Sequence, residues 1–172
     1  MAQLVVGGGC FWCVEGGLKN LRGVSEVIPG YSGGETQDPT YQQICSGNTG
    51  HAEVVRVTFD EQVIPLNTLL EVFFTLHDPT QLNRQGADIG TQYRSVIFTA
   101  DEQQRITAEQ VIEQFQANFD NEIVTEISPL EHLYIAEDYH HDYYSNNPNN
   151  PYCLSVVGPK VAKAKAKHAS LY

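Results

Sequence analysis

The sequence of 172 residues has few positive charges and no long apolar run. Ten Lys and Arg stand against twenty-one Asp and Glu, which gives a formal net charge of −11 at pH 7. This excess of negative charge repels phosphate backbones and anionic lipid, so we expect neither a nucleic-acid nor a membrane partner. No segment approaches the roughly 20 apolar residues that a membrane-spanning helix needs. The first residues also lack the basic region of a signal peptide, so we expect a cytoplasmic protein.

Cysteine is scarce and is not spaced as in a disulfide framework. The four cysteines are Cys10, Cys13, Cys45 and Cys153. In the cytoplasm thiols stay reduced, and cysteines there are usually catalytic, metal-bound or inert. A zinc site needs a second close pair of ligands, and apart from two adjacent histidines the sequence has none. We therefore expect no metal and no organic cofactor, and a structural role for Cys45.

The composition is that of an ordinary folded domain, with 41% hydrophobic and 18% charged residues. A chain of this length buries about 70% of its surface on folding, so residues 1–172 can form a single domain without disulfide or metal support. The patterns predict strands at 3–8, 24–31, 52–59, 95–98 and 123–127, and helices at 10–20, 66–77 and 136–146. A further long helix is predicted before the strand at 123–127, with an apolar stripe from 108 to 119. This order predicts an α+β two-layer sandwich with a mixed, mainly antiparallel sheet, related to the ferredoxin-like plait and covered by helices.

Long loops are expected at 35–50 and 77–93, around the site. Thr99-x-x-Glu102 predicts a capping box before the third long helix. Residues 152–157 are expected to form a last strand or an ordered tail. Four lysines then follow within a few residues, and we interpret 158–172 as a solvated Lys-rich tail.

The sharpest local feature is Gly7-Gly8-Gly9-Cys10, between a strand pattern and the first expected helix. Glycines there let the backbone turn tightly and leave the first helix amides free, where the amides and the helix dipole stabilise an anion. A thiol in such a place has its pKa lowered from about 8.5 to roughly 3.5–7.5. The sequence therefore predicts that Cys10 is a partly ionised nucleophile; the alternative is a small buried apolar residue.

Two large aromatic residues, Phe11 and Trp12, follow the thiol directly. Core packing is the usual role of such residues, but neighbours at a helix start do not point the same way. A pocket for a small apolar group beside the nucleophile is the competing interpretation. Cys10 and Cys13 also form a C-x-x-C pair, a spacing used by dithiol couples, by half of a zinc site and by a nucleophile with its resolving partner.

Gly9-Cys10-Phe11-Trp12 resembles the active-site signature of the methionine sulfoxide reductase A family. Other segments resemble the same family, in one order from residue 7 to about 153, which argues strongly against chance agreement. They are Gly30-Tyr31-Ser32-Gly33-Gly34, Pro39-Thr40-Tyr41, Cys45-Ser46-Gly47, Thr49-Gly50-His51-Ala52-Glu53, His77-Asp78-Pro79, Arg84-Gln85-Gly86-x-Asp88, Gly90-Thr91-Gln92-Tyr93-Arg94-Ser95 and Ala136-Glu137-Asp138-Tyr139-His140.

The resemblance implies an enzyme that reduces the S epimer of methionine sulfoxide, free or within proteins, and so repairs oxidised proteins. It implies thioredoxin as the reductant, and we expect a monomer. It also implies a role for each site residue. Cys10 is the nucleophile, and Glu53 is the acid that protonates the sulfoxide oxygen. Tyr41 and Tyr93 donate hydrogen bonds to that oxygen, Asp88 supports the substrate, and Phe11 and Trp12 form the pocket for the S-methyl group.

The chemistry requires such an acid independently of the resemblance. A sulfoxide oxygen leaves poorly until it is protonated, so a proton donor must lie opposite the attacking thiolate. A carboxylic acid keeps its proton at neutral pH where burial raises its pKa, and a pocket walled by aromatic side chains provides that burial. Taken alone, Glu53 is a charge at the start of a strand, and only the joint pattern gives it this role.

Attack leaves Cys10 as a sulfenic acid, which condenses with a nearby thiol to a disulfide that thioredoxin reduces by exchange. Cys153 matches the C-terminal resolving position of many family members. However, residues 154–160 resemble a strand and replace the glycine-rich tail that usually follows. Cys13 lies one helical turn from Cys10 and replaces a glycine that is common in the family. Both stay open as the resolving cysteine, with a slight preference for Cys13.

The residues alone are also compatible with two other functions. A thioredoxin-type oxidoreductase also places C-x-x-C at a helix start, but it has no use for Glu53, Tyr41 and Tyr93. A non-catalytic module would recognise methionine, oxidised or not, through its aromatic residues. Turnover separates the three functions, because they predict loss of sulfoxide, loss of disulfide, or neither.

Overall fold

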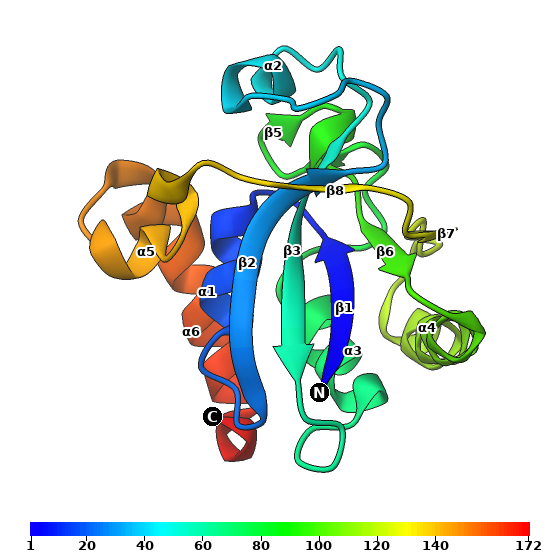
Figure 1. Cartoon of the computed structure of the whole chain (residues 1–172). Helices are drawn as coiled ribbons and strands as arrows, with labels where there is room; N and C mark the ends of the chain where they lie inside the picture. Colours follow the sequence, from blue (N-terminus) through cyan, green and yellow to red (C-terminus); the bar gives the residue numbers. More distant parts are fainter.

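The computed structural model describes residues 1–172 and contains a six-stranded sheet in the order β7-β6-β1-β3-β2-β8 (Figure 1). Its strands are β1 (Ala2–Gly7), β2 (Val24–Ser32), β3 (Ala52–Phe59), β6 (Val96–Thr99), β7 (Glu126–Pro129) and β8 (Leu133–Ile135). All neighbouring pairs are antiparallel except β6 and β7, which are parallel. The mixed, mainly antiparallel sheet is therefore confirmed, whereas its relation to the ferredoxin-like plait stays a prediction.

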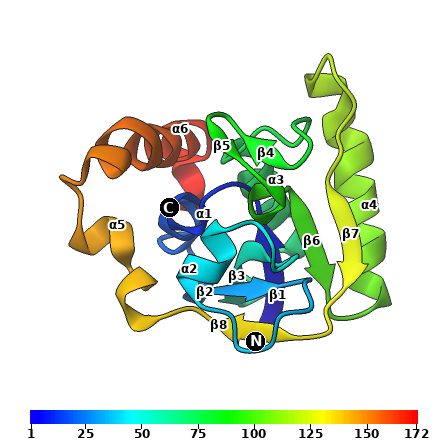
Figure 2. The same cartoon turned by 90° about the horizontal axis from the view of Figure 1, so that it is seen from above.

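The helices are α1 (Phe11–Leu18), α2 (Tyr41–Cys45), α3 (Leu66–Thr75), α4 (Glu102–Phe115), α5 (Tyr143–Asn146) and α6 (Gly158–Lys167). Helices α1, α3, α4 and α6 join one face of the sheet in a core of 28 buried residues. A smaller core of five buried residues lies on the other face, beneath the chain that leads into β8 (Figures 1 and 2). None of the helices is long and apolar enough to cross a membrane.

Strand β3 is central and buried on both faces. Val55 and Val57 face the helices, whereas Ala52 and Val54 belong to the smaller core. Side chains alternate along a strand, so Glu53 shares the helix face with the two odd-numbered valines. The strand thereby carries a carboxyl group to the level where α1 begins.

The C-terminal part differs most from the sequence prediction. Cys153–Val157 forms a π-helical turn, not a strand, and runs directly into α6. Residues 158–172 are not a solvated tail, because α6 packs against α1. Its buried side chains are Val161 and Ala164, which with Val157 form an apolar stripe at helical spacing. The four lysines make this segment look polar in the sequence, so the apolar spacing is hard to recognise there.

The two long loops also contain structure. The first holds α2, whose start is closed by a capping box in which Thr40 and Gln43 bond each other's backbone N–H. The second holds a hairpin of β4 (Arg84–Gln85) and β5 (Asp88–Ile89), followed by a 3₁₀ turn at Thr91–Tyr93. Helix α4 is capped by Asp101, which accepts from the Gln104 N–H at 2.8 Å, and not by the predicted Thr99.

Candidate active site

Cys10 lies at the turn between β1 and α1, as its sequence context predicts. It occupies the N-cap position with an extended backbone, so α1 begins at Phe11. Gly9 before it has φ +81°, a left-handed conformation that favours glycine. Gly7 is needed for a different reason, because a Cβ there would lie 2.5 Å from the carbonyl oxygen of Glu53. The glycines thus allow the turn that carries Cys10 to pack against β3.

The predicted lowering of the Cys10 pKa is wrong. Cys10 is 6% exposed, and burial raises the pKa of its thiol, with smaller contributions from its hydrogen bond to Cys13 and from the charge of Glu53. The backbone N–H of Trp12 lowers this pKa, as expected for a thiol at a helix start, but this contribution is smaller than the increase that burial causes. The hydrogen bond from Cys10 lowers the pKa of the Cys13 thiol. The two thiols therefore form one hydrogen-bonded pair in which Cys10 keeps its proton.

Glu53 has the properties of a buried acid. Its Oε1 accepts a hydrogen bond from the Phe11 N–H at 3.2 Å, and its Oε2 is buried without any partner. Burial raises the pKa of this carboxyl to about 8, because a charged group loses its hydration in the interior. The carboxyl group therefore holds a proton at neutral pH, and one of its oxygens is unpaired.

A cavity of about 350 Å³ joins these groups, a volume within the usual range for small-molecule sites. It is lined by Cys10, Trp12, Tyr41, Glu53, Asp88, Tyr93, Asn150 and Tyr152. Burial raises the pKa of Tyr41 and of Tyr93, so both phenols remain hydrogen-bond donors. The structure thus brings together residues that are far apart in the sequence around one thiol and one protonated acid.

The two aromatic residues after Cys10 lie in different surroundings. Trp12 is half-buried and lines the cavity, whereas Phe11 is fully buried and is not among the lining residues. The Phe11 ring packs between Tyr31 and His140, with centroids 5.7 and 5.0 Å away. Of the predicted apolar pocket, only Trp12 reaches the cavity, and Phe11 supports it from the core.

Comparison with known proteins shows the family. A model of the family described as peptide methionine sulfoxide reductase matches residues 2–171. The chain belongs to this family. It is 52% identical to the peptide methionine sulfoxide reductase MsrA of Saccharolobus solfataricus over 163 residues, which cover 95% of this chain and 92% of that protein.

Solved structures of family members are also similar. The reduced form of Mxr1 from Saccharomyces cerevisiae is 34% identical with a TM-score of 0.84 and covers 88% of both chains. Methionine sulfoxide reductase A of Corynebacterium diphtheriae is 37% identical with a TM-score of 0.82, over 86% of this chain and 76% of that one. A complex of Mxr1 with Trx2 is 24% identical with a TM-score of 0.59, over 83% and 84%, and shows the fold alone.

Several residues that no sequence pattern assigned to the site hold the reductase cavity together. The Tyr152 hydroxyl donates to Asp88 Oδ2 at 2.6 Å. The Tyr143 ring stacks on Trp12 with centroids 3.8 Å apart, and Trp12 Nε1 donates to His140 Nδ1 at 3.0 Å. Burial lowers the pKa of His140 to about 4, so its ring is neutral and can accept this bond. The signal available in the sequence was the density of aromatic residues between 139 and 152.

Glu15 is a second buried acid of the reductase, two residues after Cys13 on α1. It is 2% exposed, and its Oε2 accepts a hydrogen bond from the Asp142 N–H at 3.0 Å, just before α5. Burial raises the pKa of this carboxyl to about 7. Because α5 begins with Tyr143, the carboxyl group of Glu15 fixes the helix whose ring covers Trp12.

Replacing Glu15 with Ala should therefore disturb the environment of Trp12. The free Asp142 N–H should lower the free energy of unfolding by about 1–3 kcal/mol. Trp12 is the only tryptophan in the chain, so its emission reports the stacking of Tyr143 directly. The control is Glu15→Gln, which keeps an acceptor oxygen and should leave the spectrum close to that of the wild type. Identical spectra for wild type and Glu15→Ala would show that this carboxyl does not hold α5.

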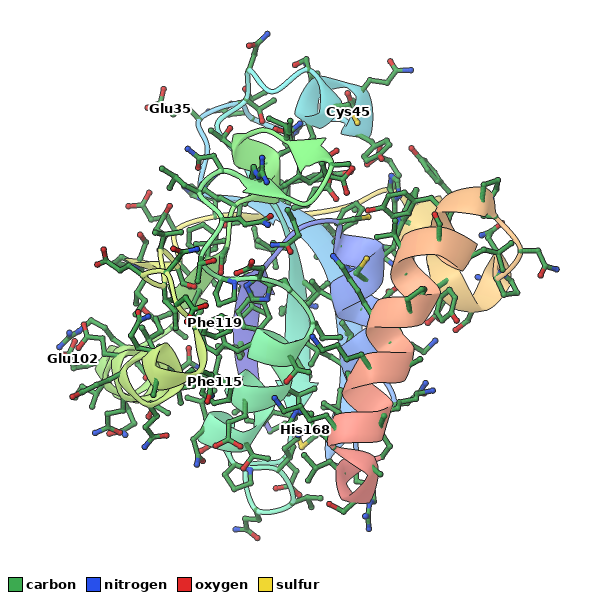
Figure 3. All side chains as sticks on the ribbon, turned by 180° about the vertical axis from the view of Figure 1, so that it is seen from behind. Glu35, Cys45, Glu102, Phe115, Phe119 and His168 are labelled. Atoms are coloured by element: carbon green, nitrogen blue, oxygen red, sulfur yellow. The ribbon has the colours of Figure 1, made fainter.

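The remaining thiols lie at three different places. Cys13 is fully buried one turn from Cys10, and its N–H donates to the Cys10 carbonyl at 3.1 Å. Cys153 is fully buried in the π-helical turn. Cys45 is exposed on α2 (labelled in Figure 3). No three His, Cys, Asp or Glu side chains are grouped to hold a metal ion.

Proposed function

We propose that this chain reduces the S epimer of methionine sulfoxide to methionine, on the free amino acid or within proteins. The observation that carries the proposal is Glu53, a buried acid whose pKa is raised to about 8 and whose Oε2 is unpaired in the cavity that Cys10 lines. A sulfoxide placed there meets a nucleophilic sulfur and a proton donor at once. This is what the first step of its reduction requires.

In the first step, Cys10 Sγ attacks the sulfoxide sulfur while Glu53 delivers its proton to the oxygen. The thiol proton of Cys10 passes to the Glu53 carboxylate in the same step, so the carboxyl group ends the step protonated. The sulfur–oxygen bond of the substrate breaks, the oxygen ends as a hydroxyl on Cys10, and methionine leaves. The substrate sulfur gains two electrons, and Cys10 is oxidised to a sulfenic acid.

Three other cavity residues orient the substrate. Tyr41 and Tyr93 keep their protons and can donate hydrogen bonds to the sulfoxide oxygen as negative charge develops on it. Asp88 accepts a hydrogen bond from the Tyr152 hydroxyl and supports the substrate from the lining of the cavity. Trp12 offers the S-methyl group its apolar face. Each of these roles follows from the donor, acceptor or apolar surface that the residue presents to the cavity.

In the second step, Cys13 attacks the sulfenic acid of Cys10, and water leaves as a Cys10–Cys13 disulfide forms. Two observations support this choice: Cys13 lies one helical turn from Cys10, and each thiol shifts the pKa of the other. Cys153 is fully buried in a π-helical turn.

Changing Cys13 to Ser should separate the two steps. We expect the first turnover to persist, with one methionine formed per chain, and thioredoxin-driven turnover to fall by about tenfold or more because the sulfenic acid is not resolved. Labelling with dimedone followed by mass spectrometry detects that sulfenic acid. The matched variant Cys153→Ser should recycle normally. The opposite result, with Cys153→Ser failing and Cys13→Ser recycling, would assign the resolving role to Cys153.

Thioredoxin is the proposed reductant of the disulfide, by thiol–disulfide exchange that oxidises the thioredoxin dithiol. The support is that Mxr1, which is 34% identical in its reduced form, is also known in complex with Trx2. We further propose that the enzyme acts as a monomer in the cytoplasm and repairs oxidised proteins. Size-exclusion chromatography of the purified chain tests the monomer.

The experiment that tests the function compares two substrates for the same purified chain with dithiothreitol. Loss of sulfoxide from a methionine sulfoxide peptide, with no more insulin reduction than dithiothreitol alone gives, is the expected result. Insulin reduction without sulfoxide loss would favour a thioredoxin-type oxidoreductase. Tight binding of the peptide without turnover would favour a binding module.

A further inference from the structure

A second cavity, of about 440 Å³, is larger than the catalytic one and shares no lining residue with it. It lies between the ends of α3 and α4 on one side and α6 on the other. Figure 3 shows this region from behind, with Phe115 and Phe119 beside α4 and His168 at the end of α6. We call it the lysine groove, and its defining side chains are Phe74, Phe115, Phe119, Lys160, Lys163 and Lys167.

The charge of the groove is positive in a strongly acidic protein. Lys160, Lys163 and Lys167 recur at spacings of three and four residues, so they lie on one face of α6. None of the three forms an ion pair with a carboxylate. The carboxylate in the lining, Asp78, already accepts from the Thr80 N–H and hydroxyl at 2.9 and 2.6 Å. Three lysines and one aspartate thus line the same space, so its positive charges outnumber the negative one.

The opposite wall of the groove is aromatic. The Phe74 and Phe115 rings pack with centroids 5.7 Å apart, and Phe119 lies beside them in the lining. Phe115 and Phe119 are only half-buried, so apolar surface remains open to the groove. A cavity of this size with an apolar wall and a few converging charged groups has the composition of a small-molecule site.

We propose that the lysine groove binds a small amphipathic anion, a carboxylate or phosphate group carried on an aromatic or aliphatic body. The anionic group lies between the lysine ammonium groups, and the body packs against the phenylalanine rings. The anionic group alone should bind weakly, because an ion pair between a hydrated anion and an exposed lysine contributes little binding free energy. The apolar body alone should also bind weakly, because the phenylalanine rings cover only one side of it.

The inner end of the groove touches the catalytic turn from behind. Gln85 packs against Gly9, and His77 packs against Gly8, where added Cβ atoms would lie 2.9 and 2.7 Å from these side chains. The Lys160 ammonium lies 3.9 Å from the Gly9 Cβ position. A bound anion would therefore change the surroundings of Gly8 and Gly9, although the sulfoxide chemistry does not need it.

The test is a calorimetric titration of the full chain with phenyl phosphate and with phenylacetate, and with inorganic phosphate and benzyl alcohol as the two separate parts. We expect saturable binding of at least one amphipathic anion, and of neither part at the same concentration. Lys163→Gln and Lys167→Gln should each raise its Kd by about tenfold. Lys165→Gln removes the same charge from the same helix but lies outside the groove, and it should leave the Kd unchanged.

Amide chemical shifts then locate the ligand, with Gly8, Gly9 and α6 expected to move. No saturable binding of either anion, or equal weakening by Lys165→Gln, would overturn the proposal. Shifts confined to the catalytic cavity would overturn it as well, since they would place the anion at the wrong site. None of these outcomes depends on sulfoxide turnover, so the groove and the proposed function can fail separately.

Discussion

A Cys10→Ser chain should reduce no methionine sulfoxide above the buffer control. The hydroxyl group that replaces the thiol does not form the bond to sulfur and has no accessible oxidised form. The fold should survive, because Ser is a favoured N-cap residue and Cys10 occupies the N-cap of α1. Methionine release measured by chromatography, with circular dichroism as a check on folding, gives the result.

The control for this variant is Cys45→Ser. Cys45 lies exposed on α2 and does not line the catalytic cavity, so turnover should stay close to that of the wild type. Cys10→Ser activity within about tenfold of the wild type would remove Cys10 from the mechanism and leave the other thiols to be considered.

Glu53→Gln should lower kcat by about 10²–10⁴-fold, the usual contribution of a general acid. The amide of Gln keeps an oxygen that can accept from the Phe11 N–H at the start of α1, so the turn should be preserved. What is lost is the acidic proton, which an amide does not supply to a leaving oxygen. Stopped-flow or quenched single turnovers measure the chemical step directly, and near-normal rates would show that the proton comes from elsewhere.

The pH profile adds an independent test of Glu53. Burial raises the pKa of this carboxyl to about 8, so the protonated form is present at neutral pH and is lost as the pH rises through that value. The rate of the chemical step should therefore fall on the alkaline side, around pH 8. The residual activity of Glu53→Gln should lack this fall. An alkaline limb that is unchanged in the variant would have to come from another group.

Much of the fold and of the site follows from local sequence signals. The Gly-rich turn, the helix start after Cys10 and the strand at 52–59 are short-range patterns, and the structure has all three. The cavity also contains six of the residues that the resemblance implies, because a motif carries information on residues that meet only in space. Glu53 is an example, because its local sequence is that of an ordinary charged residue at the start of a strand and only the motif assigns it to the site.

Properties that depend on packing were not available from the sequence. The pKa of Cys10 is set by burial and by Cys13 and Glu53, and the last is 43 positions away in the sequence, so the helix-start rule gave the wrong direction. Helix α6 was missed because its lysines outnumber the apolar side chains that pack against α1. The hydrogen bond between Glu15 and the Asp142 N–H joins residues 127 positions apart, so no local sequence pattern predicts it.

The most direct test of the central claim is the turnover of the two separated epimers of a methionine sulfoxide peptide by the wild-type chain with dithiothreitol. A cavity lined by one nucleophilic thiol and one acid presents a fixed handedness to the substrate, so we predict reduction of one epimer alone, and the family resemblance makes it the S epimer. Reduction of both epimers at similar rates, or of the R epimer alone, would contradict the proposed placement of the sulfoxide between Cys10 and Glu53.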